Sequence, residues 1–542
     1  MSAFLKPLQD VSLSAALAHI QANAATLLIG GFVLMLALRA AFRLRDVVED
    51  LDGPEPQSWV YGNMLQVQLP PVYGDYEFKW QEQFGFLYRF KGCFGQNRIM
   101  LSDPVALAYV LNSPAFVHGP TLDNILHILY GPRSVVAQRG EVHKRFRSVL
   151  NDGFTASAVR GYEPILREIA QDLAEKWEEH ATADGNAGSL DVCSDLSVAT
   201  LGAISRAVLG RTTAELGPKF MQTNFETMAL GSAQSPFAVL ADGIGCRLPT
   251  PLLRGMIYLP GKVNKTLRAA RALADNLGRE LVEEKLEGAR QGLDVSGDFY
   301  GRILGGKNAE QTLKVMSKED IAGQTAVMLL AGQDTTANTV AFALYHLARD
   351  QPLQDALRKE ISSCPRGKDM NYDSLSLLNA VVKEALRMYP AETMTDRMAT
   401  EDAVLPLSQS ITTRSGKVLH EVPVRKGQII TVNIGSYQRQ PQRWGPDPHV
   451  FRPSRWLDGS VYTGDAVGPY ANMLSFLGGN HICLGWRFAV LEMQVLIHTL
   501  ITKFSFTLPP DGEEPIACWR TTVIPVCANG EKGARLCISR VL

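Results

Sequence analysis

The sequence predicts a mainly α-helical domain with minor β structure, of the α+β class, preceded by an N-terminal transmembrane helix. Three observations lead to this prediction. The 542 residues are 46% hydrophobic and 20% charged, a composition that allows a large packed core. Between residues 140 and 400 the apolar positions recur mostly with helical spacing, whereas strand-like segments are short and few. No internal repeat divides the chain, so a single large helical domain with small sheets is more economical than several domains.

A long apolar segment near the N-terminus predicts the membrane helix. Between Val11 and Leu38 there is no acidic residue, lysine or arginine, and arginines occur directly after it at positions 39, 43 and 45. About 20 apolar residues cross a bilayer, and a basic cluster after the span places the rest of the chain in the cytoplasm. A cleaved signal peptide is the alternative, which the basic residues after the apolar segment disfavour. We therefore predict three regions: an anchor over 1–46, a linker over 47–60 and a globular domain over 61–542.

Charge and cysteine content limit the classes of protein to consider. The formal net charge is −1, which gives no bulk attraction to nucleic acid. The eight cysteines include no CxxC pair and no metal-finger spacing. This pattern favours a reducing compartment with mostly free thiols, so any single cysteine is first interpreted as a small buried hydrophobe.

Several segments of the globular region have a recognisable pattern. Two short strands are expected between residues 86 and 102, a helix from Asp103, and a hairpin between 402 and 434. One long helix is expected over 318–349. The stretch from 235 to 260 is unusually apolar for a loop, and two interpretations stay open: buried core, or a second membrane contact near a substrate entrance.

One cysteine stands in a frame that a buried thiol does not explain. Cys483 comes after glycines at 478 and 479, precedes Gly485, and is succeeded by a helical apolar pattern. A thiolate ligates haem iron where the backbone lets the flat macrocycle come close, and glycines remove the Cβ atoms that would block that approach. The amides at the start of the next helix favour the charged thiolate, and Phe476 can keep water from the sulfur. We therefore interpret Cys483 as an iron ligand.

This stretch resembles the haem-binding signature F-x-x-G-x-R-x-C-x-G of the cytochromes P-450, the haem-thiolate monooxygenases. The match covers every position except one, because His481 stands where the family has an arginine that pairs with a haem propionate. A histidine still donates one hydrogen bond, but its charge near neutral pH is conditional. The resemblance assigns Cys483 to the metal and Phe476, His481 and Gly485 to the cofactor site.

The predicted long helix contains "AGQDTT", a poor sequence for a helix centre. Gly332 and the β-branched pair Thr335 and Thr336 all lower helix propensity. The Thr335 hydroxyl can bond the Ala331 carbonyl and locally open the helix, although a kinked core helix would explain the same residues. The segment resembles the family's distal [AG]-G-x-[DE]-T-T motif, which implies that Asp334 and Thr335 pass protons to dioxygen.

Three charged residues match a structural element of the family. Glu384 and Arg387 form an E-x-x-R pair on one helix face, and such pairs are usually solvated. Their distance before Cys483, together with the "FRPSRW" segment that contains Arg455, resembles the family's Glu-Arg-Arg network. The resemblance implies a buried structural trio on the proximal face, with no part in the chemistry.

Order and spacing give further candidates for the haem propionates. His143 and Arg147 match the family's W-x-x-x-R element, with histidine in place of tryptophan. Arg397 lies ten residues after Arg387, where the family commonly has a propionate-binding arginine. Exposed helix charge is the alternative for these residues. Buried carboxylates need charge-assisted donors, so several such residues are required somewhere.

The resemblance implies a complete activity. Haem b with an axial Cys483 thiolate would use dioxygen to hydroxylate a lipophilic small molecule, and no GxGxxG segment supplies a nicotinamide or flavin site. Electrons would therefore come from NADPH through a membrane-anchored cytochrome P-450 reductase at the endoplasmic reticulum membrane. Lys144 and Arg145 are candidates for its docking patch, or ordinary surface charge. A haem-thiolate isomerase or dehydratase and a non-catalytic lipophile-binding haem protein remain alternatives.

Family analogy also marks the residues expected to line the substrate space. They are mostly apolar: Ile125, Val327, Met328, Ala331, Met394 and Thr522. Such a lining suits a terpenoid or another secondary metabolite of a fungal pathway, and it also suits a fatty acid or a xenobiotic. Glu392 and Asp396 are polar exceptions, which either face a substrate hydroxyl or point elsewhere.

Overall fold

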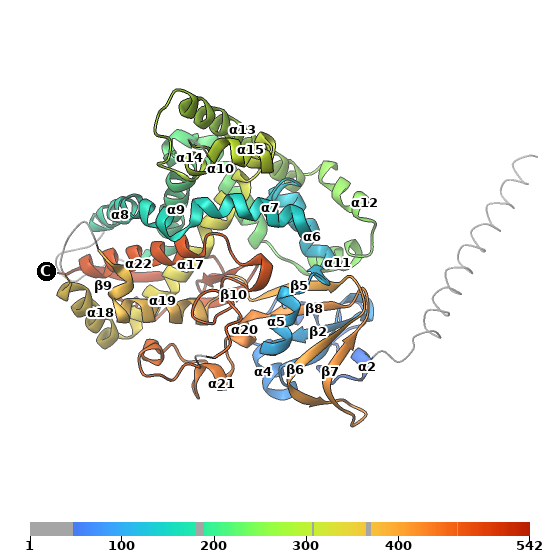
Figure 1. Ribbon diagram of the computed structural model, residues 1–542. Helices are drawn as coiled ribbons and strands as arrows, with labels where there is room; N and C mark the ends of the chain where they lie inside the picture. The colour runs from blue at the N-terminus through green and yellow to red at the C-terminus, as the bar shows by residue number, and fades with distance from the viewer. Residues whose placement is uncertain (1–46, 180–188, 306–307, 365–369, 463, 542) are drawn as a thin grey trace, which may run out of the picture. The chain divides into compact units, whose positions relative to one another are not determined.

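The computed structural model describes residues 47–179, 189–305, 308–364, 370–462 and 464–541 (Figure 1). Leu51–Leu542 forms one compact unit. The segment before it is described only at α2, Val47–Asp50, so the predicted membrane helix lies outside the described residues. The boundaries proposed for anchor, linker and globular domain stay predictions.

The largest sheet has five strands in the order β1-β2-β8-β5-β3. Only the β2–β8 pair is parallel. The two strands and the helix predicted over 86–112 are confirmed, and the Asp103 carboxylate caps that helix by accepting from the Val105 and Ala106 amides at 3.0 Å. The strand bounds are Leu87–Lys91 for β1, Asn97–Leu101 for β2, Phe116–His118 for β3, Met394–Ala399 for β5 and Ile429–Asn433 for β8.

Three smaller sheets complete the β structure. The predicted hairpin is confirmed as β6 (Ala403–Thr412) and β7 (Val418–Val424). A second hairpin pairs β10 (Ile516–Trp519) with β11 (Val523–Val526). The third sheet has the order β4-β12-β9, formed by Ser189–Asp191, Arg535–Arg540 and Phe504–Thr507.

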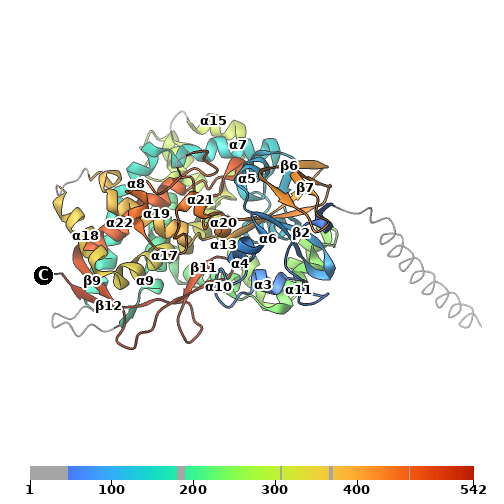
Figure 2. The ribbon, with the colours of Figure 1, turned by 90° about the horizontal axis from the view of Figure 1, so that it is seen from below.

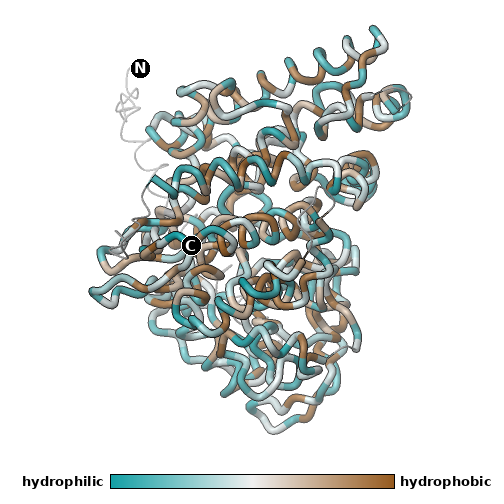
Figure 3. The backbone as a smooth tube through the Cα atoms, turned by 90° about the vertical axis from the view of Figure 1, so that its left-hand side faces the viewer, coloured by the Kyte–Doolittle hydropathy of each residue, from teal (hydrophilic) through white to brown (hydrophobic). Residues whose placement is uncertain are grey.

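Helices form the greater part of the chain, and Figures 1 and 2 show them stacked beside the main sheet. Hydrophobic residues concentrate along the central helices (Figure 3). The remaining helix bounds are α3 Met64–Gln68, α4 Glu77–Phe84, α5 Pro104–Asn112, α6 Pro120–Tyr130, α7 Gly140–Leu150, α8 Ala156–Glu178, α9 Val192–Ile204, α10 Thr213–Ser232, α11 Pro236–Gly245, α12 Thr250–Gly255, α13 Lys262–Arg290, α14 Phe299–Leu304, α15 Asn308–Val315, α16 Lys318–Ala322, α17 Thr325–Arg349, α18 Gln351–Ser363, α19 Ser376–Met388, α20 Ile434–Tyr437, α21 Pro441–Trp444 and α22 Trp486–Lys503.

The helix predicted over 318–349 is in fact two helices, α16 and α17, so that prediction was wrong at its N-terminal end. The break falls at Gly323 and Gln324. The Gln324 side chain is fully buried, accepts from the Val135 amide at 2.8 Å and donates to the Arg133 carbonyl at 2.8 Å. These bonds fix the chain direction at the break, and α17 alone is about 37 Å long at 1.5 Å per residue.

Helix α17 crosses the core and packs most closely against α9. Gly332 explains the close approach, because a Cβ atom there would lie 2.6 Å from Ile204 Cγ1 on α9. The glycine that lowers helix propensity therefore serves helix packing. Among the described residues, one segment, Val192–Leu209, has the length and hydropathy of a membrane span, and 78% of it is buried within the protein.

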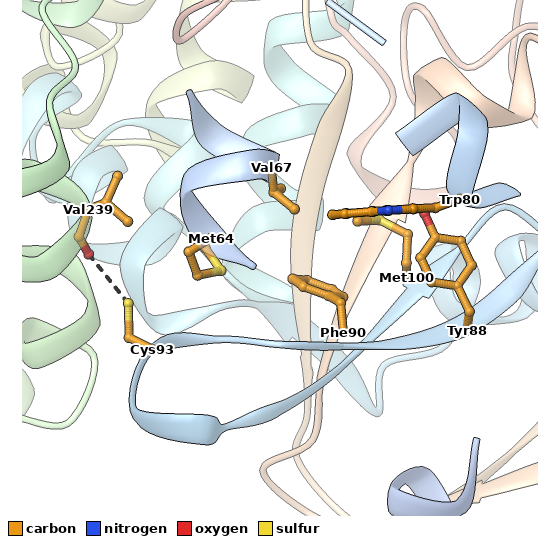
Figure 4. Close-up of a cluster of buried hydrophobic side chains, with 8 residues drawn as sticks. All are labelled: Met64, Val67, Trp80, Tyr88, Phe90, Cys93, Met100 and Val239. Carbon is orange, nitrogen blue, oxygen red and sulfur yellow. Dashed lines mark hydrogen bonds between the residues drawn. The ribbon is translucent and has the colours of Figure 1, made fainter. Parts of the chain in front are cut away.

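A cluster of buried side chains joins α3, α4 and α11 to β1 and β2 (Figure 4). It includes Trp80, Phe90 and Val239, and the Cys93 thiol approaches the Val239 carbonyl at 3.8 Å. The apolar stretch 235–260 is thus core only in part. Other side chains of the same stretch are exposed, namely Phe237 (78%), Leu252 (59%), Tyr258 (76%) and Leu259 (52%).

Candidate functional site

Cys483 lies between the short helix η8 (Gly479–His481) and α22. Its amide donates to the Phe476 carbonyl at 2.9 Å, and the Phe476 side chain is 8% exposed. The thiol is free and accessible to water, yet desolvation by the surrounding protein raises its pKa, against the opposing hydrogen bond from the Gly485 amide. The sulfur atom is thus within reach of a ligand, while the surrounding protein disfavours its charged form.

The two glycines before Cys483 are required by the backbone around them. Gly479 has φ +66°, and a Cβ atom there would lie 2.1 Å from the Leu111 carbonyl oxygen of α5. A Cβ atom at Gly478 would lie 2.2 Å from the Val467 carbonyl oxygen. Both positions therefore need glycine for close backbone packing and, at 479, for a left-handed conformation. Gly485 has no such neighbour, since its nearest contact would be Phe154 at 3.9 Å.

The face of α17 that carries Ala331 and Thr335 opens onto a hollow inside the protein. Ala331 is exposed although most of α17 is buried, and Thr335, one turn further, is half-buried. The Thr335 hydroxyl donates to the Ala331 carbonyl at 2.9 Å, as predicted, but the helix remains continuous through this bond. Because the hydroxyl donates its hydrogen to this bond, its oxygen remains free to accept a hydrogen bond from a group in the hollow.

Asp334 is held on both carboxylate oxygens by side chains from distant parts of the chain. Ser197 of α9 donates to Oδ1 at 3.0 Å, and the Lys532 ammonium lies 2.8 Å from Oδ2. Lys532 belongs to the loop between β11 and β12, and its side chain is 27% exposed. Sequence reasoning missed this lysine, because it lies 198 residues from Asp334 and carries no motif.

Three imidazoles lie close together, with their rings tilted, beside the cysteine loop. His481 lies 4.3 Å from His143 of α7 and 4.7 Å from His118 of β3, measured between ring centroids. Desolvation lowers the pKa to about 2 for His118, about 4 for His143 and about 3 for His481. His118 was not predicted from the sequence. It lies opposite Arg397 in the antiparallel β3–β5 pair, and this register places it beside His481.

The side chains of two arginines near these rings form no ion pair with a described residue. Arg397 is 2% exposed and donates only to neutral oxygens, Thr395 Oγ1 at 3.1 Å and the Asp396 carbonyl at 3.0 Å. The Arg147 side chain makes no hydrogen bond or ion pair with a described residue. The Cys483 thiolate would act on it through space and raise its pKa. Glu392 and Asp396 supply negative charge to Arg397 only through space, so a bound anionic group would stabilise this buried guanidinium.

The structure brings Glu384, Arg387 and Arg455 together, each completely buried. Arg387 donates to Glu384 through Nε at 2.9 Å and Nη2 at 2.8 Å, and Arg455 Nε donates to Glu384 Oε1 at 2.9 Å. Burial alone would raise the pKa of Glu384, but the two guanidinium groups outweigh it and lower that pKa. The trio joins α19 to the η7 segment, Pro453–Trp456.

The residues predicted to line the substrate space lie in different surroundings. Ile125 of α6 is 44% exposed, and Thr522 between β10 and β11 is half-buried. Val327 and Met328 of α17 are both 7% exposed. Met394 packs against the cluster of Figure 4. Of the two polar exceptions, Asp396 binds Arg98 at 3.0 Å and Thr431 at 2.7 Å, so it is committed to the sheet.

A separate, partly open pocket lies between α6, α10, α13 and α17. Its α17 lining consists of Ala326, Leu329 and Leu330. With 3.6 residues per turn, these positions face away from Ala331 and Thr335, so the cavity is not part of the motif site.

The described residues fit a haem group. They offer one accessible thiol, a hydroxyl-bearing helix, and a set of donors in which the Arg397 and Arg147 side chains bind no carboxylate. Cys483 would hold the iron, and the arginines with His118, His143 and His481 would hold the two propionates. Histidine in place of the family's usual arginine at 481 is thus accompanied by two further imidazoles.

Comparison with known proteins agrees with this arrangement. The family model described as cytochrome P-450 matches residues 53–528. Cytochrome P-450 monooxygenase 91 of Postia placenta is 27% identical over 511 residues, covering 88% of this chain and 91% of the relative. Cytochrome P-450 monooxygenase claP of Ampulloclitocybe clavipes is 27% identical over 499 residues, covering 90% and 92%. With its cysteine loop, central helix and buried ion trio in place, the chain belongs to the cytochrome P-450 family and is a cytochrome P-450 monooxygenase.

Proposed function

We propose that this monooxygenase hydroxylates a lipophilic small molecule of the terpenoid or secondary-metabolite type, with haem b ligated by Cys483. The observation that carries the proposal is the Asp334–Thr335 pair of α17, with Thr335 one turn from the accessible Ala331, together with the accessible thiol of Cys483. Bound haem would supply the activation of dioxygen, with the thiolate increasing electron density at the iron. The similarity to fungal relatives supports a role in fungal metabolism.

The protein's own residues supply and direct protons. Lys532 is partly exposed and touches Asp334, so it links the buried carboxylate to solvent. Thr335 comes directly after Asp334, and its hydroxyl oxygen can accept a hydrogen bond in the hollow while it donates to Ala331. An enzyme that only isomerises or a protein that only binds lipophiles needs no such proton supply, which disfavours both alternatives.

Lys532→Met is expected to lower product formation about tenfold, because Asp334 loses a charge-assisted hydrogen bond and its connection to solvent. Peroxide release per NADPH and the solvent deuterium isotope effect should rise, while Lys532→Arg restores most of the coupling. Lys314→Met is the matched control, since its ion pair with Glu310 is exposed. An unchanged isotope effect and unchanged coupling in Lys532→Met would exclude this role.

Electron supply and location form the second part of the proposal. We infer that NADPH–cytochrome P-450 reductase is the partner and that the protein is held at the endoplasmic reticulum membrane by residues 1–46. Exposed Phe237, Tyr258 and Trp59, at 78%, 76% and 72%, support contact with a lipid surface. Lys144 and Arg145, the candidates for the reductase docking patch, are exposed, and Lys144 forms an ion pair with Glu141 at 2.7 Å. Full-length protein should resist a high-salt wash of membranes, and its release by salt alone would contradict the anchor.

The test of the proposed function is reconstitution in microsomes with reductase and a panel of terpenes and fatty acids. NADPH consumption should depend on substrate, and mass spectrometry should find a product that has gained one oxygen atom, labelled when heavy dioxygen is used. Conversion without NADPH would favour an isomerase or a dehydratase. Binding of lipophiles without conversion of any of them would favour a carrier.

A further inference from the structure

The two side chains that hold the Asp334 carboxylate come from α9 and from the loop that joins β11 to β12. Ser197 of α9 donates to one carboxylate oxygen at 3.0 Å, and Lys532 of the loop lies 2.8 Å from the other. The Lys532 ammonium also lies 3.4 Å from the Ser197 hydroxyl. The geometry at Asp334 therefore depends on how α9 and the loop are held relative to each other.

Asp191 connects these two parts of the chain. It is the last residue of β4 and the N-cap residue of α9, where its Oδ1 atom accepts from the Cys193 amide at 3.1 Å. The same oxygen accepts from the Ala534 amide at 2.8 Å, two residues after Lys532. The Val192 amide donates to the Ala534 carbonyl at 3.0 Å. A single carboxylate oxygen thus joins the start of α9 to the end of the loop.

Fixed backbone leads from this contact to Lys532. The Gly533 amide donates to the Pro525 carbonyl at 3.0 Å. Val526 and Lys532 form an isolated antiparallel bridge. The loop also packs closely on the carboxylate, because a Cβ atom at position 533 would lie 3.2 Å from Asp191 Oδ1. The place of Lys532 is therefore set by backbone that Asp191 holds.

We propose that Asp191 is a positioning residue for proton supply, which keeps the loop where Lys532 reaches Asp334 while Ser197 bonds the same carboxylate. The inference rests on the proposed function, in which Lys532 links Asp334 to solvent. Without the Asp191 carboxylate, the Ala534 amide loses its acceptor and the loop is free to move away from α9. The strongly hydrated ammonium group would then spend more time in water and less time in contact with Asp334.

Acetylation of Lys532, followed by mass spectrometry of the haem-loaded full-length protein, tests the positioning directly. Asp191→Ala should make Lys532 react about fivefold faster than in wild-type protein, because the loop loses a hydrogen bond that protects the ammonium group. Asp191→Asn should react at nearly the wild-type rate, since its amide oxygen accepts the same two bonds. Asp350→Ala is the matched control, because Asp350 caps α18 by accepting from the Leu353 amide at 3.0 Å. An unchanged rate in Asp191→Ala, or an equal rise in the control, would overturn the inference.

A double-mutant cycle with reductase and NADPH tests the consequence for turnover. Asp191→Ala alone should lower product formation about fivefold and raise the solvent deuterium isotope effect, with recovery in Asp191→Asn. In Lys532→Met protein, Asp191→Ala should have almost no further effect, because the group that Asp191 positions is absent. An equal loss in both backgrounds would overturn the inference, since Asp191 would then act through stability and not through Lys532.

The same measurements separate failure of this inference from failure of the proposed function. Impaired coupling in Lys532→Met together with normal coupling in Asp191→Ala would overturn the inference and leave proton supply by Lys532 intact. Normal coupling in Lys532→Met would overturn both. The carbon monoxide spectrum of each reduced variant reports thiolate ligation independently of proton supply, so it shows whether the haem site itself has been preserved.

Discussion

Cys483→Ser is expected to eliminate substrate hydroxylation altogether while leaving the fold intact. A serine hydroxyl is not ionised near neutral pH, so it cannot provide the anionic sulfur that the enzyme would present to iron. The cost to the fold is small, because Cys483 faces a hollow and its backbone amide, which bonds the Phe476 carbonyl, is unchanged. Product formation with reductase and NADPH measures the first effect, and thermal unfolding measures the second.

Cys364→Ser provides the control for this variant. Cys364 is a free cysteine like Cys483, but it is half-buried and lies just after α18, outside the site. It should retain wild-type turnover. Hydroxylation by Cys483→Ser at a rate close to that of the control would contradict the assignment of the ligand.

Glu384→Leu is expected to lower the free energy of unfolding by about 3–5 kcal/mol, a large part of a typical total. Removing this carboxylate leaves the guanidinium groups of Arg387 and Arg455 without a counter-charge at positions that are completely buried. It also removes the acceptor for the Arg452 amide at 2.8 Å. Denaturant unfolding of purified protein measures the loss, and a low yield of haem-loaded protein should accompany it.

The matched control is Glu310→Leu, which breaks an ion pair with Lys314 whose side chains are 80% and 69% exposed. That change should cost less than about 1 kcal/mol. Glu384→Gln should fall between the two, because the amide keeps one acceptor without the charge. Similar stabilities for the Glu384 and Glu310 variants would show that the trio does not hold the proximal side together.

The sequence predicted those parts of the fold and site that depend on local pattern or on a motif. The helix that begins after Asp103, the strand pair before it and the Thr335 bond to Ala331 all involve residues close together in the chain. The trio around Glu384 was predicted only through family resemblance, since no local rule joins Glu384 to a residue 71 positions away.

The remaining features depend on tertiary contacts that no local pattern contains. The break at Gln324 requires the segment at 133–135, and Asp334 is held by a lysine 198 residues away. Whether Glu392 or Asp396 has a partner within the protein was open for the same reason. Asp396 forms an ion pair with Arg98, 298 residues earlier in the chain. Only the folded chain shows that Glu392 has no such partner among the described residues.

The central claim is that the Cys483 thiolate, which is accessible in this structure, holds haem iron. The most direct measurement is the absorption spectrum of the purified, reduced, full-length protein with carbon monoxide. We predict stoichiometric haem and the spectrum of a thiolate-ligated complex. Protein that takes up no haem, or whose spectrum is that of a nitrogen-ligated complex, would contradict it.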